Sequence, residues 1–158
     1  MLGVRLLQIN PLTTYMISER RIRMNKVLPA KQMVEVGEDF LMALQARDFD
    51  QLEACFQPDI HFRALVPPGI REGTDAHETV SWLKRWFDDA DEFQTLMSSV
   101  HEVADRLHIT YRFRLRKGID WKVIEQQAYC VVSDDRIQVM NLLCSGFRPD
   151  PDYQRRID

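Results

Sequence analysis

Residues 107–116 read LHITYRFRLR, and this stretch decides the fold of the chain. Apolar side chains occupy every odd position from Leu107 to Leu115, and polar side chains occupy the positions between them. Because successive side chains of a β-strand point to opposite faces of a sheet, this alternation predicts a strand with one dry and one wet face. The chain is therefore expected to contain a sheet that has one covered face.

The sequence on either side of this strand predicts three helices and four further strands. Residues 31–46 carry apolar side chains at three- and four-residue steps, which indicates an amphipathic helix. Asp48 is expected to cap a short second helix, and a third helix is expected over residues 74–87. The further strands are expected over residues 60–66, 95–103, 121–132 and 137–147. Helices followed by an antiparallel meander indicate the α+β class.

The length of 158 residues suits one domain. We expect a basic, poorly ordered N-terminal extension (residues 1–28), one folded domain (29–149) and a C-terminal tail (150–158). Residues 1–31 hold six basic side chains against one acidic, a charge of +5, and the other residues hold 15 against 23, a charge of -8. The resulting net charge of -3 argues against a nucleic-acid-binding protein that relies on bulk charge.

The cysteines and histidines show no metal-binding or disulfide spacing. Cys55, Cys130 and Cys144 are an odd number of cysteines without a CxxC pair, so free thiols in a reducing cytoplasm are expected. The four histidines also lack the spacing of metal ligands, and no metal or other cofactor is expected. No apolar run approaches the roughly 20 residues that span a bilayer. We therefore expect a cytoplasmic protein that contacts neither membrane nor nucleic acid.

Four short motifs resemble the nuclear transport factor 2-like superfamily, whose fold is also called cystatin-like. They are FLMALQARDFD at residues 40–50, FQPDI at 56–60, REGT at 71–74 and SDDRI at 133–137. The superfamily includes ketosteroid isomerases, SnoaL-like polyketide cyclases and scytalone dehydratases. The resemblance covers roughly residues 30–149 and implies a cone-shaped, curved antiparallel sheet wrapped around helices, with one internal pocket. It says little about function, because this fold carries many activities.

The last hairpin gives a first prediction of which side chains face the pocket. A two-residue turn at Asp134 and Asp135 places Ser133 opposite Arg136. Directly opposite residues of two strands share a face of the sheet. Counting back from this turn predicts that one face carries Glu125, Gln127, Tyr129, Met140, Leu142 and Cys144.

The preceding hairpin, which turns near Gly118, allows two registers. A two-residue turn places His108 and Thr110 on the Glu125 face, whereas a three-residue loop with a left-handed Gly118 places the apolar side chains there. Burial of the apolar side chains favours the loop. The predicted pocket lining of the sheet is Tyr111, Phe113, Trp121, Val123, Glu125, Gln127, Met140, Leu142 and Cys144. The helical residues expected to cover it are Phe40, Leu44, Trp82 and Trp86.

Glu125 is the candidate general acid or base, because an acid on an apolar inward face has a raised pKa. The structural alternative is a hydrogen bond within the pocket or an ion pair with an arginine. The resemblance places Ala64, Phe40 and Gln127 where ketosteroid isomerases carry their catalytic groups, so that chemistry is not expected here. Cys144 is expected to be a neutral thiol, because the negative charge of Glu125 would disfavour a thiolate.

The arginines suggest two further roles. Arg112, Arg114 and Arg116 form a stripe on the wet face, which is either solvated or a homodimer interface, since dimers of this fold often pair through the sheet. Arg63 and Arg148 are candidates to hold an acidic ligand at the pocket rim.

Three functions from different classes fit this sequence. The first is a small-molecule-binding protein with an apolar pocket. The second is a cofactor-free lyase, isomerase or hydrolase that uses Glu125, with Tyr111 or Gln127 orienting the substrate. The third is an interaction module that pairs through the outer face of the sheet. The absence of a complete acid–base pair favours the first.

Overall fold

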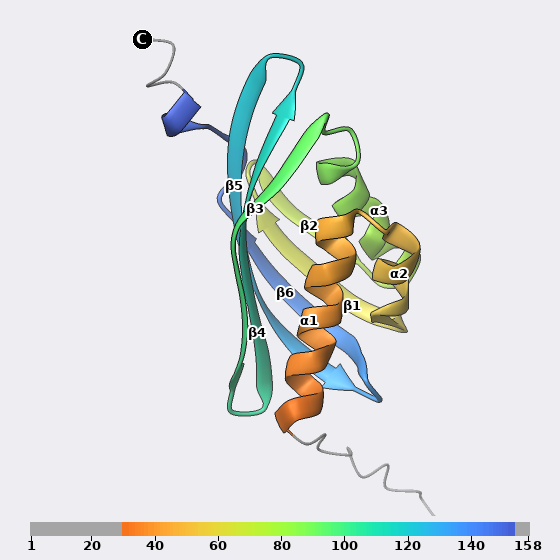
Figure 1. The fold of residues 1–158 in the computed structure, drawn as a ribbon. Coiled ribbons are helices and arrows are strands. Elements are labelled where there is room, and N and C mark those ends of the chain that lie inside the picture. Colours follow the sequence, from red (N-terminus) through yellow and green to blue (C-terminus); the bar gives the residue numbers. More distant parts are fainter. Residues whose placement is uncertain (1–29, 154–158) are drawn as a thin grey trace, which may run out of the picture.

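The computed structural model describes residues 30–153, and the predicted N-terminal extension lies outside the described residues. Three helices and seven strands form one body (Figure 1). The helices are α1 (Ala30–Ala46), α2 (Phe49–Ala54) and α3 (Ala76–Phe87). The strands are β1 (Phe56–Val66), β2 (Gly69–Gly73), β3 (Glu92–Val103), β4 (Arg106–Lys117), β5 (Asp120–Ser133), β6 (Arg136–Cys144) and β7 (Arg148–Pro149).

The strands form one curved sheet in the order β2-β1-β6-β5-β4-β3, and β7 pairs with β5 beside this path. β1 and β6 run parallel, and the other pairs are antiparallel. All three helices lie on one side of the sheet, and the C-terminal segment lies on the other (Figure 1). The predicted α+β class is confirmed. Within residues 30–153, no helix is both long and apolar enough to cross a membrane.

The core fills the space between the helices and the inner face of the sheet. The predicted dry face of β4 is confirmed, because its odd-numbered residues from Leu107 to Leu115 have no exposed surface. On α1, the buried face predicted from the helical period also reaches this core. Fully burying such a side chain contributes about 1.5–3 kcal/mol each, so this layer holds the sheet against the helices. The α1 residues involved are Val36, Phe40, Leu41 and Leu44.

The register of the last hairpin differs from the prediction. The two-residue turn is confirmed, since Asp134 and Asp135 have φ of +48° and +62° and Ser133 pairs with Arg136. One extra residue, Gln138, then sits on β6, so that Val132 pairs with Ile137 but Val131 pairs with Val139. This bulge shifts every later pair by one residue. The predicted pairing of Glu125 with Cys144 is wrong, and Gln126 faces Cys144 instead.

The turn between β4 and β5 also differs from the prediction. It is a two-residue turn at Gly118 and Ile119, with Lys117 paired to Asp120, rather than a three-residue loop. Tyr111 therefore lies opposite Gln126. The apolar residues of β4 face inward as predicted. The residues of β5 that were predicted to face inward beside them, however, lie on the outer face. The correct inward residues of β5 are Ile124, Gln126, Ala128 and Cys130, all at most 2% exposed.

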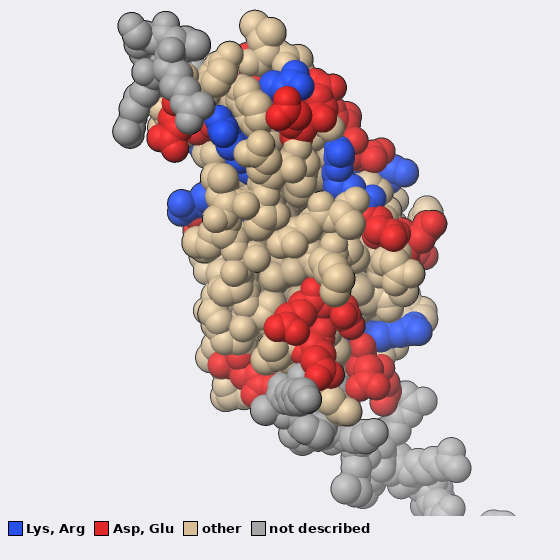
Figure 2. Space-filling model, viewed as in Figure 1, with Lys and Arg blue, Asp and Glu red and all other residues tan. Residues whose placement is uncertain are grey.

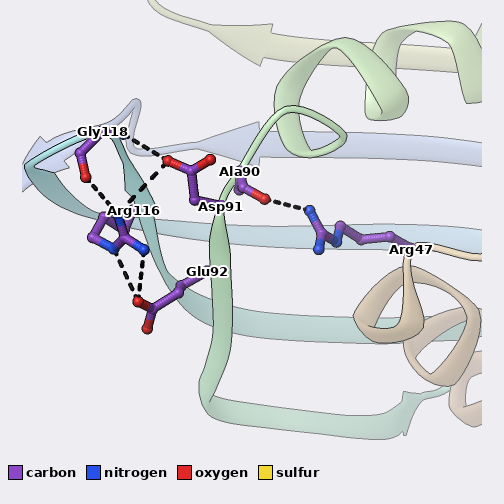
Figure 3. A network of polar contacts seen from close by, with 6 residues as sticks. All are labelled: Arg47, Ala90, Asp91, Glu92, Arg116 and Gly118. Atoms are coloured by element: carbon purple, nitrogen blue, oxygen red, sulfur yellow. Dashed lines mark hydrogen bonds and ion pairs between the residues drawn. The ribbon is translucent and has the colours of Figure 1, made fainter.

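Two arginines fasten the loops at the end of the sheet where α3 stops. Arg47, just after α1, donates to the carbonyl oxygen of Ala90 at 2.7 Å (Figure 3). It also donates to the carbonyl oxygen of Phe87 at 3.4 Å, so it caps the C-terminal end of α3. Arg116 binds Glu92 at 2.8 Å and donates to the Gly118 carbonyl at 2.6 Å. These contacts tie the β4–β5 turn to the start of β3.

Candidate functional site

A pocket of about 330 Å³ opens where β6 ends and the chain turns toward β7. Apolar and polar atoms share its walls about equally, and two arginines are among the lining residues. A concave site that offers both apolar surface and polar groups can hold a small molecule. The lining residues are Val66, Pro67, Arg71, Trp86, Ile124, Cys144, Ser145, Gly146, Phe147 and Arg148.

The loop from Cys144 to Arg148 shapes one wall of this pocket. Gly146 has a φ of +74°, and a Cβ atom added there would lie 3.0 Å from the Cγ atom of Pro67. Glycine is therefore suited to this position for its backbone conformation and for its close approach to the β1–β2 turn. The loop is also tied to β5, since Ser145 Oγ accepts a hydrogen bond from the backbone N–H of Glu125 at 2.9 Å.

Arg71 and Arg148 bring positive charge to the pocket. Arg71 lies on β2, where its guanidinium sits 5.5 Å from the ring centroid of Trp82. Arg148 lies on β7, opposite Val123 of β5. Within residues 30–153, neither side chain forms an ion pair with a carboxylate. The lining residues named above include no aspartate or glutamate, so the pocket favours a negatively charged group.

A buried polar pair lies beside the pocket on the inner face of the sheet. Tyr111 donates its hydroxyl proton to Gln126 Oε1 at 2.6 Å. Burial raises the pKa of Tyr111 well above its ordinary value, and the neighbouring Cys144 and Cys130 raise it further. Burial also raises the pKa of Cys130 to about 12. The tyrosine is therefore a neutral donor, and Cys130 is a thiol rather than a thiolate near pH 7.

The structure separates the predicted site residues into two groups. Most of them face inward and are buried as predicted, although of the predicted lining residues only Trp86 and Cys144 line the 330 Å³ pocket, together with the predicted rim residue Arg148. The inward group is Phe40, Leu44, Tyr111, Phe113, Met140, Leu142 and Cys144. Trp82 is partly buried and packs against the core, with its indole N–H donating to the Glu72 carbonyl at 3.1 Å.

The predicted inward positions of Glu125, Gln127, Trp121 and Val123 are wrong. All four alternate with the buried residues of β5 and lie on the outer face, because the bulge at Gln138 shifts the register. The Glu125 side chain is 41% exposed, and its Oε2 accepts a hydrogen bond from Arg112 Nε at 2.8 Å. The candidate acid or base therefore lies across the sheet from the pocket. It forms an ion pair with an arginine, which was the alternative to a catalytic role in the sequence analysis.

The arginine stripe on the outer face is paired with carboxylates. Arg112 pairs with Glu125, and Arg116 pairs with Glu92 at 2.8 Å. Arg114 lies 2.6 Å from Asp150, whose side chain is 4% exposed, and over the ring of Trp121 at 4.2 Å. The N–H of Arg114 is not aligned for a hydrogen bond, so the contact with Asp150 is an ion pair. The stripe is therefore part of the structure of the outer face rather than a free basic surface.

Arg63 and Arg148, the predicted rim arginines, have different surroundings. Arg148 lines the pocket as predicted, whereas Arg63 points to the outer face and pairs with Glu72 at 3.4 Å. Arg71 takes the rim position instead. The sequence did not indicate it, because no strand was expected between residues 66 and 74, where β2 lies. Gln126 was missed because of the register error. Its neighbours Ile124 and Ala128 are more apolar than Glu125 and Gln127, and this contrast is the signal that identifies the buried face.

A second hollow, of about 400 Å³, lies between α1 and α2 and differs in charge from the pocket. Asp39, Asp48 and Asp135 are among its lining residues. Acidic side chains also gather over α1 on the surface seen in Figure 2. An anion is therefore disfavoured at this hollow. Within residues 30–153, no group of three or more histidine, cysteine or acidic side chains is placed to hold a metal ion.

Comparisons with known proteins agree with this architecture. A family model described as a SnoaL-like domain matches residues 38–140. No curated protein matches the chain.

Several solved structures share the fold at low sequence identity. An LEH-like epoxide hydrolase of M. tuberculosis is 19% identical, with a TM-score of 0.57 over 73% of this chain and 84% of that one. Bal32a, from a soil-derived mobile gene cassette, is 12% identical, with a TM-score of 0.63 over 73% and 91%. An NTF2-like protein from Burkholderia xenovorans LB400 is 12% identical, with a TM-score of 0.55 over 74% and 92%. At these identities the likeness concerns the fold alone.

Proposed function

The chain belongs to the SnoaL-like domain family, and from this premise we propose that it binds a small apolar molecule with an acidic group in the pocket beside Cys144. The fold of this family implies either small-molecule binding or cofactor-free isomerase, cyclase or hydrolase activity. The observation that carries the proposal is the pair of arginines, Arg71 and Arg148, in a pocket whose lining holds no carboxylate.

The pocket is suited to both parts of such a molecule. Val66, Ile124 and Trp86 offer apolar surface to the body of a ligand. A guanidinium group binds a carboxylate through two parallel hydrogen bonds, which fixes orientation as well as charge. The volume of about 330 Å³ lies at the lower end of the range of roughly 300–1,000 Å³ for small-molecule pockets. The favoured ligand is therefore compact, with one or two rings or a short chain.

Binding without chemistry is favoured over a reaction in this pocket. General acid–base catalysis needs a side chain that can exchange a proton with the substrate near neutral pH. The residues that line the pocket include no carboxylate and no imidazole. Glu125, the base of the enzymatic alternative, lies on the outer face. A cofactor-free lyase, isomerase or hydrolase that uses Glu125 is therefore not supported.

A thermal unfolding experiment tests the proposal. We expect 2-naphthylacetic acid to raise the melting temperature at neutral pH, because a ligand that binds only the folded state stabilises it. The uncharged 2-naphthylacetamide should have a much smaller effect, since it cannot pair with the arginines. The Arg71→Met variant should lose most of the response to the acid. Arg63→Met, which removes an arginine from the outer face, is the matched control. An equal response to acid and amide would contradict the proposal.

A second candidate function is self-association through the outer face of the sheet. Leu65, Ile70, Tyr129 and Leu143 are each 47–54% exposed and line an outer groove of about 550 Å³. Exposed apolar clusters of this kind mark interaction surfaces. The groove lies across the edge strand β2 and its neighbours β1, β6 and β5, away from the ion pairs of Arg112 and Arg114. A second copy of the chain fits it, because apolar clusters of this kind are self-complementary around a twofold axis, and Arg63, the charged residue of the lining, is already paired with Glu72.

Light scattering after size exclusion tests this second candidate. The chain should elute with the mass of a dimer, and Leu143→Asp should yield a monomer because it places a charge in the apolar contact. Arg112→Met, on the same face but outside the groove, should remain dimeric. A wild-type monomer at 100 µM would rule out the interface.

A further inference from the structure

Three side chains form a row across the inner face of the sheet and end at the pocket. Tyr111 of β4 lies opposite Gln126 of β5, and Gln126 lies opposite Cys144 of β6. Cys144 lines the pocket, as does Ile124, which precedes Gln126 on the same face of β5. Gln126 is not itself among the lining residues; its side chain lies behind the wall that Cys144 and Ile124 form, one strand away from Cys144.

The contact with Tyr111 decides which half of the amide is available. The tyrosine hydroxyl donates to Gln126 Oε1 at 2.6 Å, and burial keeps this tyrosine protonated. The other half of the amide, Nε2, has no hydrogen-bond acceptor among the described residues, although Gln126 is only 1% exposed. A buried donor without an acceptor is destabilising, and most such groups in folded proteins are paired. Gln126 Nε2 is thus a fixed N–H donor that lacks a partner.

We propose that the pocket ligand carries a carbonyl oxygen at the end opposite its acidic group, and that Gln126 Nε2 donates a hydrogen bond to it. This inference rests on the proposed function and narrows the ligand class to apolar keto acids. The acid binds Arg71 and Arg148 at the rim, and the ketone reaches inward past Cys144. Tyr111 acts as a positioning residue, because its hydroxyl holds the amide with Nε2 free to donate.

A pair of synthetic probes tests the inference by calorimetry. One is 4-(4-acetylphenyl)butanoic acid, and the other is its planar isostere 4-(4-isopropenylphenyl)butanoic acid, in which a methylene group replaces the ketone oxygen. We expect the ketone to bind the wild-type protein about three- to tenfold more tightly, which is the usual range for one neutral hydrogen bond. In Gln126→Met the two probes should bind equally. The matched control Gln127→Met, on the outer face, should keep the difference.

A spectroscopic measurement on the wild-type protein covers the case in which Gln126→Met fails to fold. With a ¹³C-labelled ketone, the carbonyl stretching frequency should be lower in the complex than in an apolar solvent, because a donated hydrogen bond weakens the C=O bond. Equal binding of the two probes to the wild type, or an unshifted carbonyl band, would overturn the keto-acid assignment while leaving the acid site intact. Failure of both acids to bind would overturn the proposed function and this inference together.

Discussion

Polar side chains have different surroundings on the two faces of β5. On the outer face, Glu125 remains exposed and pairs with Arg112. On the inner face, Gln126 and Cys130 are buried, and burial holds the Cys130 thiol in its neutral form. The pocket belongs to neither pattern, since Arg71 and Arg148 are charged and lack a carboxylate partner within the described residues. This difference teaches that the outer charges serve the structure, whereas the pocket charges remain available for a ligand.

The largest expected effect on the outer face comes from the ion pair of Arg114 and Asp150, the most buried one among the described residues. Asp150→Asn removes the negative charge but keeps an oxygen that can accept the hydrogen bond now received from Asp152 N. Arg114, whose side chain is 19% exposed, then loses its partner, and breaking a buried pair in this way lowers the free energy of unfolding by about 3 kcal/mol. Urea denaturation measures this change. A loss below about 1 kcal/mol would show that the pair behaves like an exposed one.

The buried Cys130 thiol on the inner face is expected to lower the stability of the fold at alkaline pH. The pKa of Cys130 rises from 9.0 to about 12 in the folded state. Above pH 9 the unfolded chain releases this proton while the folded chain keeps it, so stability is full below pH 9 and falls as pH rises. At pH 10.5 the loss from this residue is about 2 kcal/mol, at 1.36 kcal/mol per pH unit. Tyr111, whose pKa is also raised, adds to the loss above its ordinary pKa of 10.0.

The Cys130→Ala variant isolates this contribution. Its stability should depend less steeply on pH between 9 and 10.5 than that of the wild type, in urea denaturation curves at each pH. Identical slopes for the two proteins would show that the thiol titrates normally in the folded state. Comparing slopes rather than absolute stabilities removes the cost of the cavity that alanine leaves.

Exposed charge pairs on the outer face should matter little. Glu125→Gln is expected to lower the free energy of unfolding by less than about 1 kcal/mol, because exposed ion pairs gain little in water and are screened by salt. The same variant should leave the affinity for 2-naphthylacetic acid unchanged, since the side chain lies across the sheet from the pocket. A strong loss of ligand affinity in calorimetry would show that Glu125 contributes to ligand binding.

The smallest expected effect on stability is at the pocket itself. Arg71→Met removes a charge that has no ion-pair partner among the described residues, so the free energy of unfolding should change by at most about 0.5 kcal/mol. Its methionine side chain can still pack against Trp82. A loss of several kcal/mol in urea denaturation would indicate that Arg71 has a structural role like that of Arg114.

Much of the fold could be predicted from the sequence, because the signals are periodic and local. The alternation over residues 107–116 identified β4 and its buried face, and the resemblance to the nuclear transport factor 2-like superfamily is confirmed by the SnoaL-like family match. The short edge strand β2 was missed because no strand was expected between residue 66, where the first strand was expected to end, and the helix expected from residue 74.

The candidate site was harder to predict, because it depends on register. The prediction lacked one bulge residue, Gln138, and therefore placed Glu125 on the inner face instead of the outer face. A shift of one residue has this effect because the side-chain period of a strand is two residues. The burial pattern of β6 shows the bulge. Its buried residues are Ile137, Met140, Leu142 and Cys144, so a three-residue step precedes the two-residue steps. Because Val139 and Leu143 are also apolar, the sequence does not show this step. The pocket loop at Gly146 depends on contacts between distant parts of the chain, and no local pattern identifies it.

Titration calorimetry of 2-naphthylacetic acid against the wild type and the Arg71→Met/Arg148→Met double variant tests the central claim most directly. Hydrogen bonds to charged groups contribute about 1.5–3 kcal/mol each, so removing both arginines should weaken binding by about 100-fold or more. The double variant should otherwise unfold at the same urea concentration as the wild type. An unchanged dissociation constant in a folded double variant would show that the pocket arginines do not recognise the acid.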